Sequence, residues 1–181
     1  IPREFRQISS TRISSHTSDL IPYIKTRGDF DVAGACYPEG HPDSETLDED
    51  IENLRKKVDS GADHLITQLF FDNDYFYNFR DKAVKAGINV PIEAGIMPVV
   101  NKNQIERMVT TCGASLPHKF VKIMQKYGQN PKAMRDAGIA YAINQIVDLA
   151  ASDVDGIHLY SMNNAYVARK ISESVSGVLG E

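Results

Sequence analysis

Short apolar runs alternate with longer amphipathic segments along most of this sequence. The runs are apolar without clean polar alternation, and they predict strands at residues 31–37, 64–71, 90–97 and 155–161. The segments around them predict helices at residues 18–27, 46–60, 74–86, 102–112, 117–127, 131–151 and 163–176. Strands of this kind, separated by helices, are typical of a parallel sheet that helices cover.

The segment at 46–60 has the clearest helical pattern. Its apolar residues follow helical spacing, at Leu47, Ile51, Leu54 and Val58. Thr46 and Glu49 have the spacing of a capping box, and Gly61 stands where a helix commonly stops. These features together predict a helix at residues 46–60.

Two architectures fit this order of elements, a small doubly wound sheet and part of a (β/α)₈ barrel. Both place ligand sites at the carboxyl ends of the parallel strands. In this sequence the strand ends are residues 37–41, 68–72, 95–98 and 160–163. The search for functional residues is therefore narrowed to these segments and the helices that follow them.

Composition excludes several classes of partner. The chain has 20 Lys and Arg against 24 Asp and Glu, a formal net charge of −4, which argues against a dedicated nucleic-acid binder. No apolar run approaches the ~18 to 20 residues of a membrane span, and the first residues form no hydrophobic signal region. We expect a cytoplasmic protein that binds neither nucleic acid nor membrane, with Cys36 and Cys112 reduced.

Common nucleotide and metal motifs are missing from the sequence. There is no G-x-G-x-x-G, no Walker phosphate loop and no H-E-x-x-H, and the five His are scattered without metal-ligand spacing. These absences disfavour a Rossmann dehydrogenase, a P-loop enzyme and a zinc protease, and we expect no metal site.

The most informative constellation is the loop at 37–41 with the helix predicted after it. At about 100° per residue, Asp50, Asn53 and Lys57 form a stripe along one flank of the apolar helix face. An acceptor, an amide and a cation in line can hold a ligand with hydroxyl and phosphate groups, while Tyr37 offers a stacking face and His41 a donor. The alternative is a solvated helix face whose charges pair separately.

Three other polar residues each admit two interpretations. Gln68, within an apolar run, is either a reader of a heterocycle or a core amide satisfied by backbone. Gln104 is either a similar reader or part of a helix start, and its capping-box spacing from Asn101 favours the helix start. Glu93 interrupts the third strand and is either a catalytic acid or a side chain facing outward among the helices.

Four short strings stand out at the predicted strand ends and in the helix after the first strand. They are Y-P-E-G-H-P at 37–42, D-x-x-N-x-x-K-K at 50–57, T-Q-L-F-F-D at 67–72 and G-I-M-P at 95–98. Together they resemble the methylenetetrahydrofolate reductase family. The resemblance runs from about residue 18 to residue 179 with matching order and spacing. Members of this family are (β/α)₈ barrels that bind FAD, and they transfer a hydride from NADH or NADPH through the flavin to methylenetetrahydrofolate, making 5-methyltetrahydrofolate.

The resemblance also implies roles for individual residues. The positions it assigns to FAD are Ala35, Tyr37, His41, Asp50, Asn53, Lys56 and Lys57, with His16 and Thr17 at a further FAD contact of weaker similarity. It assigns Gln68 and Gln104 to the folate, where two amides suit the donor and acceptor edge of a pterin. Lys57 is then expected to bind a phosphate.

Departures from the family pattern shape what we expect of this chain. Family members have four more strands upstream, with a general-acid Glu near the first, so we expect residues 1–181 to be a single domain, the C-terminal half of the barrel. Residues 1–17 are expected to be a loop and residues 18–181 the β/α units. Met108 and Asn164 stand where many members have an aromatic residue and an Arg in the folate site.

Half a barrel leaves strand edges unpaired and an inner face uncovered. We therefore expect the chain to be inactive alone and to meet the missing N-terminal half of the barrel. Separately, we expect a homo-oligomer. A second hypothesis is a non-catalytic half-barrel that binds nucleotide or folate or acts in assembly. A third is a doubly wound nucleotide binder unrelated to flavin.

Overall fold

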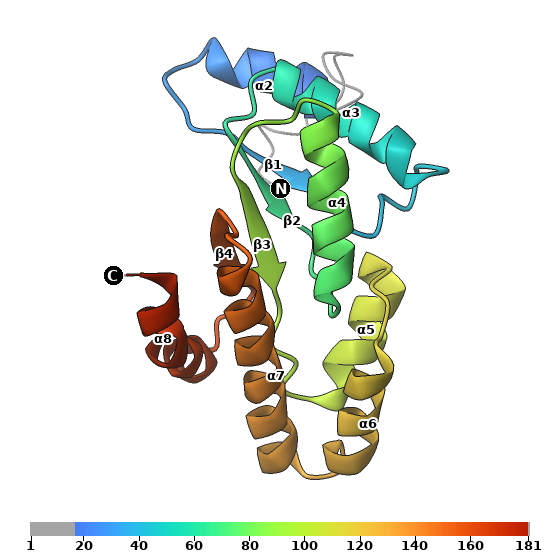
Figure 1. Cartoon of the computed structure of the whole chain (residues 1–181), viewed down its shortest axis with the longest axis vertical. Coiled ribbons are helices and arrows are strands. Elements are labelled where there is room, and N and C mark those ends of the chain that lie inside the picture. Colours follow the sequence, from blue (N-terminus) through green and yellow to red (C-terminus); the bar gives the residue numbers. More distant parts are fainter. Residues whose placement is uncertain (1–16, 181) are drawn as a thin grey trace, which may run out of the picture.

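A parallel sheet of four strands organises the molecule (Figure 1). The computed structural model describes residues 17–180, apart from the side chains at positions 102, 106, 107 and 110. The strands are β1 (Ala33–Cys36), β2 (His64–Thr67), β3 (Ile92–Ile96) and β4 (Gly156–Leu159). Each lies within a predicted run, and every neighbouring pair is parallel.

Helices follow the strands as the amphipathic segments predict. They are α2 (Thr17–Lys25), α3 (Leu47–Asp59), α4 (Asn73–Lys85), α5 (Lys102–Cys112), α6 (His118–Tyr127), α7 (Pro131–Ala151) and α8 (Ala165–Leu179). The predicted capping box is present at α3, where the Thr46 side chain accepts from the Glu49 N–H. In residues 17–180, no helix has both the length and the apolar character needed to cross a bilayer.

The order of the strands decides between the two architectures. Each strand pairs with the next strand in the chain, giving the order β1-β2-β3-β4. A doubly wound sheet reverses its strand order at a switch point, whereas a (β/α)₈ barrel adds strands in one direction. The sheet is therefore a segment of a (β/α)₈ barrel, which confirms the predicted fold class, and the doubly wound alternative is wrong.

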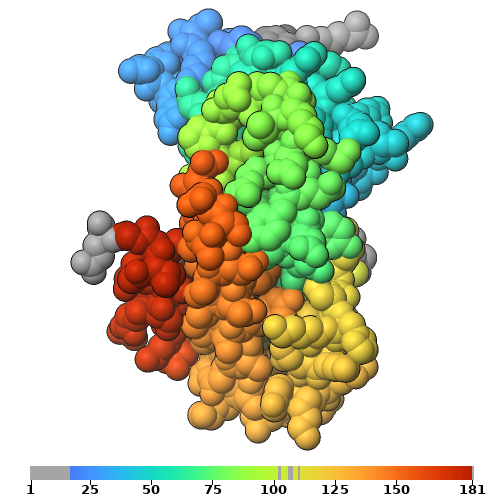
Figure 2. Space-filling model, viewed as in Figure 1, coloured from blue at the N-terminus to red at the C-terminus, as the bar shows by residue number. Residues whose placement is uncertain are grey.

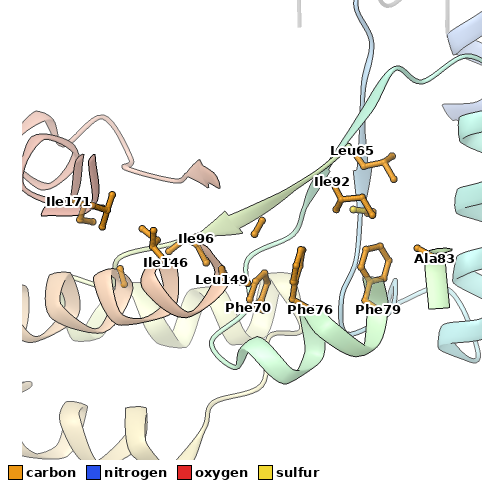
Figure 3. Packing of buried hydrophobic residues seen from close by; sticks show 14 of the residues in the cluster. Leu65, Phe70, Phe76, Phe79, Ala83, Ile92, Ile96, Ile146, Leu149 and Ile171 are labelled. Atoms are coloured by element: carbon orange, nitrogen blue, oxygen red, sulfur yellow. The ribbon is translucent and has the colours of Figure 1, made fainter. Parts of the chain in front are cut away.

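The main core lies between one face of the sheet and the helices. Ile92 and Ile96 of β3 lie on the side of the sheet that carries Phe76 of α4 and Leu149 of α7 (Figure 3), and Leu65 of β2 belongs to the same buried cluster. The residues that alternate with them face the other side of the sheet, which the described helices leave uncovered. In a closed barrel, this other side is the inner face.

A second core lies beyond the carboxyl ends of the strands. It is formed by Leu69, Phe71, Met97, Val99, Ile105, Ala114, Phe120 and Met134. These residues join the strand ends to α5, α6 and α7, which form the lower lobe of the molecule, yellow and orange in Figures 1 and 2. We call residues 102–137 of this region the α5–α6 lobe.

The second strand is shorter than predicted. Residues 68–71 are apolar enough to continue it, yet the strand ends at Thr67. The carbonyl groups of Phe70 and Phe71 accept hydrogen bonds from Gln145 and Tyr141 of α7 instead of from a neighbouring strand. Contacts with residues of α7, 70 and 75 positions away in the chain, thus replace the strand pairing that the local pattern suggests.

Candidate functional site

A pocket of about 430 Å³ lies at the carboxyl end of β1, between that strand and α3. It brings together every residue assigned to FAD that the structure describes: Thr17, Ala35, Tyr37, His41, Asp50, Asn53, Lys56 and Lys57. His16 lies outside the described residues. Five residues that the sequence reasoning missed also line the pocket: Ser18, Cys36, Asp43, Ser44 and Leu54. Most of these are chain neighbours of predicted residues, which is the signal that would have found them.

Asp50 holds the loop that enters the pocket. It lies in the first turn of α3, its side chain is 9% exposed, and one carboxylate oxygen accepts from the His41 N–H at 3.1 Å. Burial raises the pKa of Asp50 above its ordinary value, while the hydrogen bond from His41 and the charge of Lys57 act in the opposite direction. A buried carboxylate at this position fixes the end of the loop to α3.

Tyr37 and His41 form an aromatic pair on this loop. Their ring centroids are 4.6 Å apart with the rings nearly perpendicular. Nδ1 of His41 accepts from the Asp43 N–H at 3.1 Å, so a neutral His41 carries its proton on Nε2. The pair therefore offers the pocket an aromatic surface together with a hydrogen-bond donor.

Two lysines supply positive charge to the pocket. Nζ of Lys57 donates to the Ala35 carbonyl at 2.5 Å, and Nζ of the exposed Lys56 donates to Asn53 Oδ1 at 3.0 Å. Burial lowers the pKa of Lys57, and the negative charge of Asp50 acts in the opposite direction. Both ammonium groups keep donors beyond these bonds, because each has three.

Cys36 lies at the base of the same pocket and is almost fully buried. Burial is the main reason that the pKa of its thiol is raised, since a thiolate would lose its hydration there. Burial and the raised pKa together favour a packed thiol at Cys36 over a nucleophile.

A second pocket, of about 270 Å³, lies on the inner face of the sheet. It is lined by Ala33, Gly34, Ala35, Tyr37, Ile66, Gln68, His158 and Tyr160. Ala35 and Tyr37 line both pockets, so the two adjoin at the end of β1. Oε1 of Gln68 accepts from the Leu69 N–H, and among residues 17–180 no acceptor lies on its Nε2. The amide can thus donate to a ligand in this pocket.

Sequence reasoning missed the contribution of β4 to the second pocket. The Tyr160 hydroxyl donates to the Thr67 carbonyl at 2.9 Å, and the rings of Tyr160 and His158 meet edge to face. Thr67 in turn accepts the Gly95 N–H through its own hydroxyl. Only the pairing of β4 with β3 brings these residues beside Gln68, so no local motif indicates them.

Gln104 lies apart from both pockets. Its N–H donates to Asn101 Oδ1, and its side-chain Oε1 accepts from the Val100 N–H at 3.1 Å. The capping interaction predicted from the sequence is therefore present. Gln104 lines neither of the two pockets, and its assignment to the folate stays a prediction.

Glu93 faces the inner side of the sheet, away from the helices. Its carboxylate lies between His64 of β2, at 3.8 Å, and His158 of β4, at 3.7 Å. The structure therefore excludes the outward orientation among helices. Within residues 17–180, no three His, Cys, Asp or Glu side chains are arranged to hold a metal ion.

A solved structure shares this fold. It is an uncharacterized protein from Clostridium thermocellum, described as binding two copies of 5-methyl-5,6,7,8-tetrahydrofolic acid. The TM-score is 0.60 at 16% sequence identity, and the match covers 87% of this chain and 57% of that chain. At this identity, the likeness supports the fold.

Sequence comparisons identify the family. The chain is 32% identical over 160 residues to 5,10-methylenetetrahydrofolate reductase of Escherichia coli (strain K12), covering 88% of this chain and 54% of the relative. It is 34% identical over 168 residues to methylenetetrahydrofolate reductase 1 of Schizosaccharomyces pombe, covering 92% of this chain and 28% of the relative. The chain thus spans about half the length of its bacterial relatives, or less for the yeast one. The family model for methylenetetrahydrofolate reductase matches residues 3–176, and the chain belongs to that family.

Proposed function

We propose that this chain forms the FAD-binding part, and a portion of the folate site, of a methylenetetrahydrofolate reductase. The observation that carries the proposal is the convergence of the residues assigned to FAD on one pocket at the carboxyl end of β1. In (β/α)₈ barrels this end of the strands is where ligands bind. Family membership supports the reaction, and the geometry supports the cofactor.

The chemistry of the pocket fits a flavin dinucleotide. A dinucleotide presents phosphates, ribityl and ribose hydroxyls and aromatic rings. The pocket offers cations at Lys56 and Lys57, a shielded acceptor at Asp50, and an aromatic pair at Tyr37 and His41. The phosphates would bind the two lysines, and the hydroxyl groups would donate to the Asp50 carboxylate. An aromatic ring of the cofactor would pack on the Tyr37–His41 pair.

The protein's part in this reaction is to bind and orient the reactants. FAD would supply the hydride chemistry, with NADH or NADPH as the donor and methylenetetrahydrofolate as the acceptor. Gln68 would hydrogen-bond the pterin edge from the second pocket, which adjoins the first through Tyr37 and Ala35. The solved neighbour described as binding a methylated tetrahydrofolate supports a folate on this fold.

The complete activity would need the rest of the barrel. We propose that residues 1–181 act as one domain, the C-terminal half of the barrel, and that the general-acid Glu comes from the N-terminal half. Within residues 17–180, the outer edges of β1 and β4 pair with no strand, which supports a partner at both edges. This chain alone would then reduce folate weakly or not at all.

Reconstitution tests the proposal. The purified chain is mixed with a separately expressed N-terminal half-barrel from a bacterial relative, and FAD binding and reduction of methylenetetrahydrofolate by NADH and by NADPH are measured. We expect both to appear in the mixture. Lys57→Ala should weaken FAD binding about tenfold, the loss of one charged hydrogen bond, whereas Lys85→Ala, at an exposed position of α4, should have no effect.

Other outcomes separate the alternatives. Turnover by the chain alone would refute the claim that it is incomplete. Binding of FAD or folate without turnover, in a mixture shown to assemble, would favour the non-catalytic half-barrel. An assembled mixture that binds no FAD would refute the proposed function.

A further inference from the structure

Glu39 connects two loops that are far apart in the sequence. It lies between Tyr37 and His41, in the loop that enters the FAD pocket. Its two carboxylate oxygens lie 3.1 and 3.0 Å from the backbone N–H of Ser115, 76 positions along the chain. Ser115 belongs to the connection between α5 and α6. No role in either pocket is assigned to Glu39, which lines neither of them.

The pocket loop, residues 37–41, is also held by the buried Pro38, by hydrogen bonds within residues 37–44 and by a bond to α3. The Gly40 N–H donates to the Tyr37 carbonyl within the loop, and the His41 N–H donates to Asp50 of α3. Gly40 adopts a φ of +89°, which closes this turn and favours glycine. Glu39 therefore makes the side-chain contact that holds the middle of the loop against the α5–α6 lobe.

The other side of the contact is well fixed. Gly113 ends α5 in a left-handed conformation, and Ala114 is buried in the second core. Pro117 begins α6 without a side-chain cap, so the Glu39 carboxylate adds negative charge near a helix start that has none. A hydrogen bond from N–H to an ionised carboxylate is also stronger than one between neutral groups.

We propose that Glu39 is a positioning residue for the FAD pocket. Its carboxylate binds the pocket loop to the α5–α6 lobe, and this contact fixes the position of the Tyr37–His41 pair relative to the cofactor. Because α5 also carries Gln104, the same contact links the FAD side of the site to the segment that family resemblance assigns to folate. The inference rests on the proposed function and deepens it.

Three variants test the inference in the reconstituted barrel. Glu39→Ala removes the acceptor. Glu39→Gln keeps one oxygen that can accept the Ser115 N–H. Glu52→Ala removes an exposed carboxylate of α3 as a matched control. We expect Glu39→Ala to weaken FAD binding about five- to tenfold, as the loss of one positioned charged hydrogen bond would, and to shift the flavin absorbance bands. Glu39→Gln should restore most of the affinity, and Glu52→Ala should match the wild type.

Hydrogen exchange of the ligand-free chain distinguishes positioning from general stability. In Glu39→Ala, we expect faster exchange in peptides covering residues 37–44 and 113–117 and unchanged exchange in α4 and α8. Unchanged exchange in both loops, or wild-type FAD affinity in Glu39→Ala, would overturn the inference, as would equally faster exchange throughout the chain. If the wild type binds no FAD, the proposed function fails and the positioning role fails with it, whereas the exchange result still shows whether the contact exists.

Discussion

Nζ of Lys57 donates to the carbonyl oxygen of Ala35 at 2.5 Å, joining the last turn of α3 to β1. The neighbouring Cys36 carbonyl accepts from the Gln68 N–H, on the β2 side of the strand. Since successive carbonyls alternate between the edges of a strand, that of Ala35 points to the edge that β2 leaves free. The ammonium group of Lys57 therefore lies at the free edge of β1 beside the pocket, and it is partly buried.

This position predicts a pH dependence of cofactor binding. Burial lowers the pKa of Lys57 below its ordinary value of 10.5. Between the lowered value and 10.5, the folded chain binds fewer protons than the unfolded chain, so this group makes stability rise with pH through that window. The proposed contact of Lys57 with a phosphate of FAD needs the charged form, so FAD affinity should fall through the same window. Fluorescence titrations with FAD from neutral pH to about pH 10 measure it.

Lys57→Arg is the control for that pH dependence. Arginine stays charged over this range, so the variant should lose the alkaline decline in FAD affinity even if its affinity at neutral pH is lower. An alkaline decline of equal size in Lys57→Arg would assign the effect to another group.

Two variants of Asp50 separate the effect of its charge on stability from the effect of its hydrogen bond. Burial raises its pKa above 3.8, so between 3.8 and the raised value the folded chain binds more protons, and the contribution of Asp50 to stability falls as pH rises through that window. Asp50→Asn keeps an oxygen for the His41 N–H and should lose this dependence with little loss of stability at neutral pH. Asp50→Ala leaves that N–H without its acceptor and should lower the free energy of unfolding by about 1–2 kcal/mol. Urea unfolding between about pH 4 and pH 7 compares the two; equal effects of both variants at neutral pH would contradict this account.

Two helical glycines should respond oppositely to the same substitution. A Cβ on Gly138 of α7 would lie 1.8 Å from the Val99 carbonyl oxygen, whereas a Cβ on Gly177 of α8 would meet nothing within 4 Å. Gly138→Ala should therefore destabilise the chain by roughly 2–3 kcal/mol through overpacking. Gly177→Ala should stabilise it by about 0.5–1 kcal/mol, the difference in helix propensity. Urea unfolding measures both, and a stable Gly138→Ala chain would show that α7 does not pack so closely on residue 99.

The two cysteines should differ in reactivity. Cys36 is buried and its thiol pKa is raised, whereas Cys112 is partly exposed on α5. Treatment of the native chain with iodoacetamide near pH 8 should modify Cys112, and Cys36 should react only after unfolding. Mass spectrometry of the digested protein measures both sites. Modification of Cys36 at the rate of Cys112 would mean that the base of the pocket opens in solution.

Local patterns in the sequence were sufficient for much of the fold. Helical spacing and the Thr46–Glu49 capping box place α3 within a residue or two, because a helix depends mainly on its own periodicity and ends. The same periodicity puts Asp50, Asn53 and Lys57 on one flank of α3, and all three line the pocket. Their partners Tyr37 and His41 lie close by in the chain, so this half of the site was accessible to sequence reasoning.

Tertiary packing decided the rest. Residues 68–71 have the composition of a strand, yet side chains of α7 donate to the carbonyl groups of Phe70 and Phe71. Tyr160 lines the second pocket because β4 pairs with β3. Glu39 contacts Ser115 because the α5–α6 lobe lies beside the pocket loop. These contacts join residues 70 to 93 positions apart, and local periodicity holds no information about which distant backbone group will come within hydrogen-bonding distance.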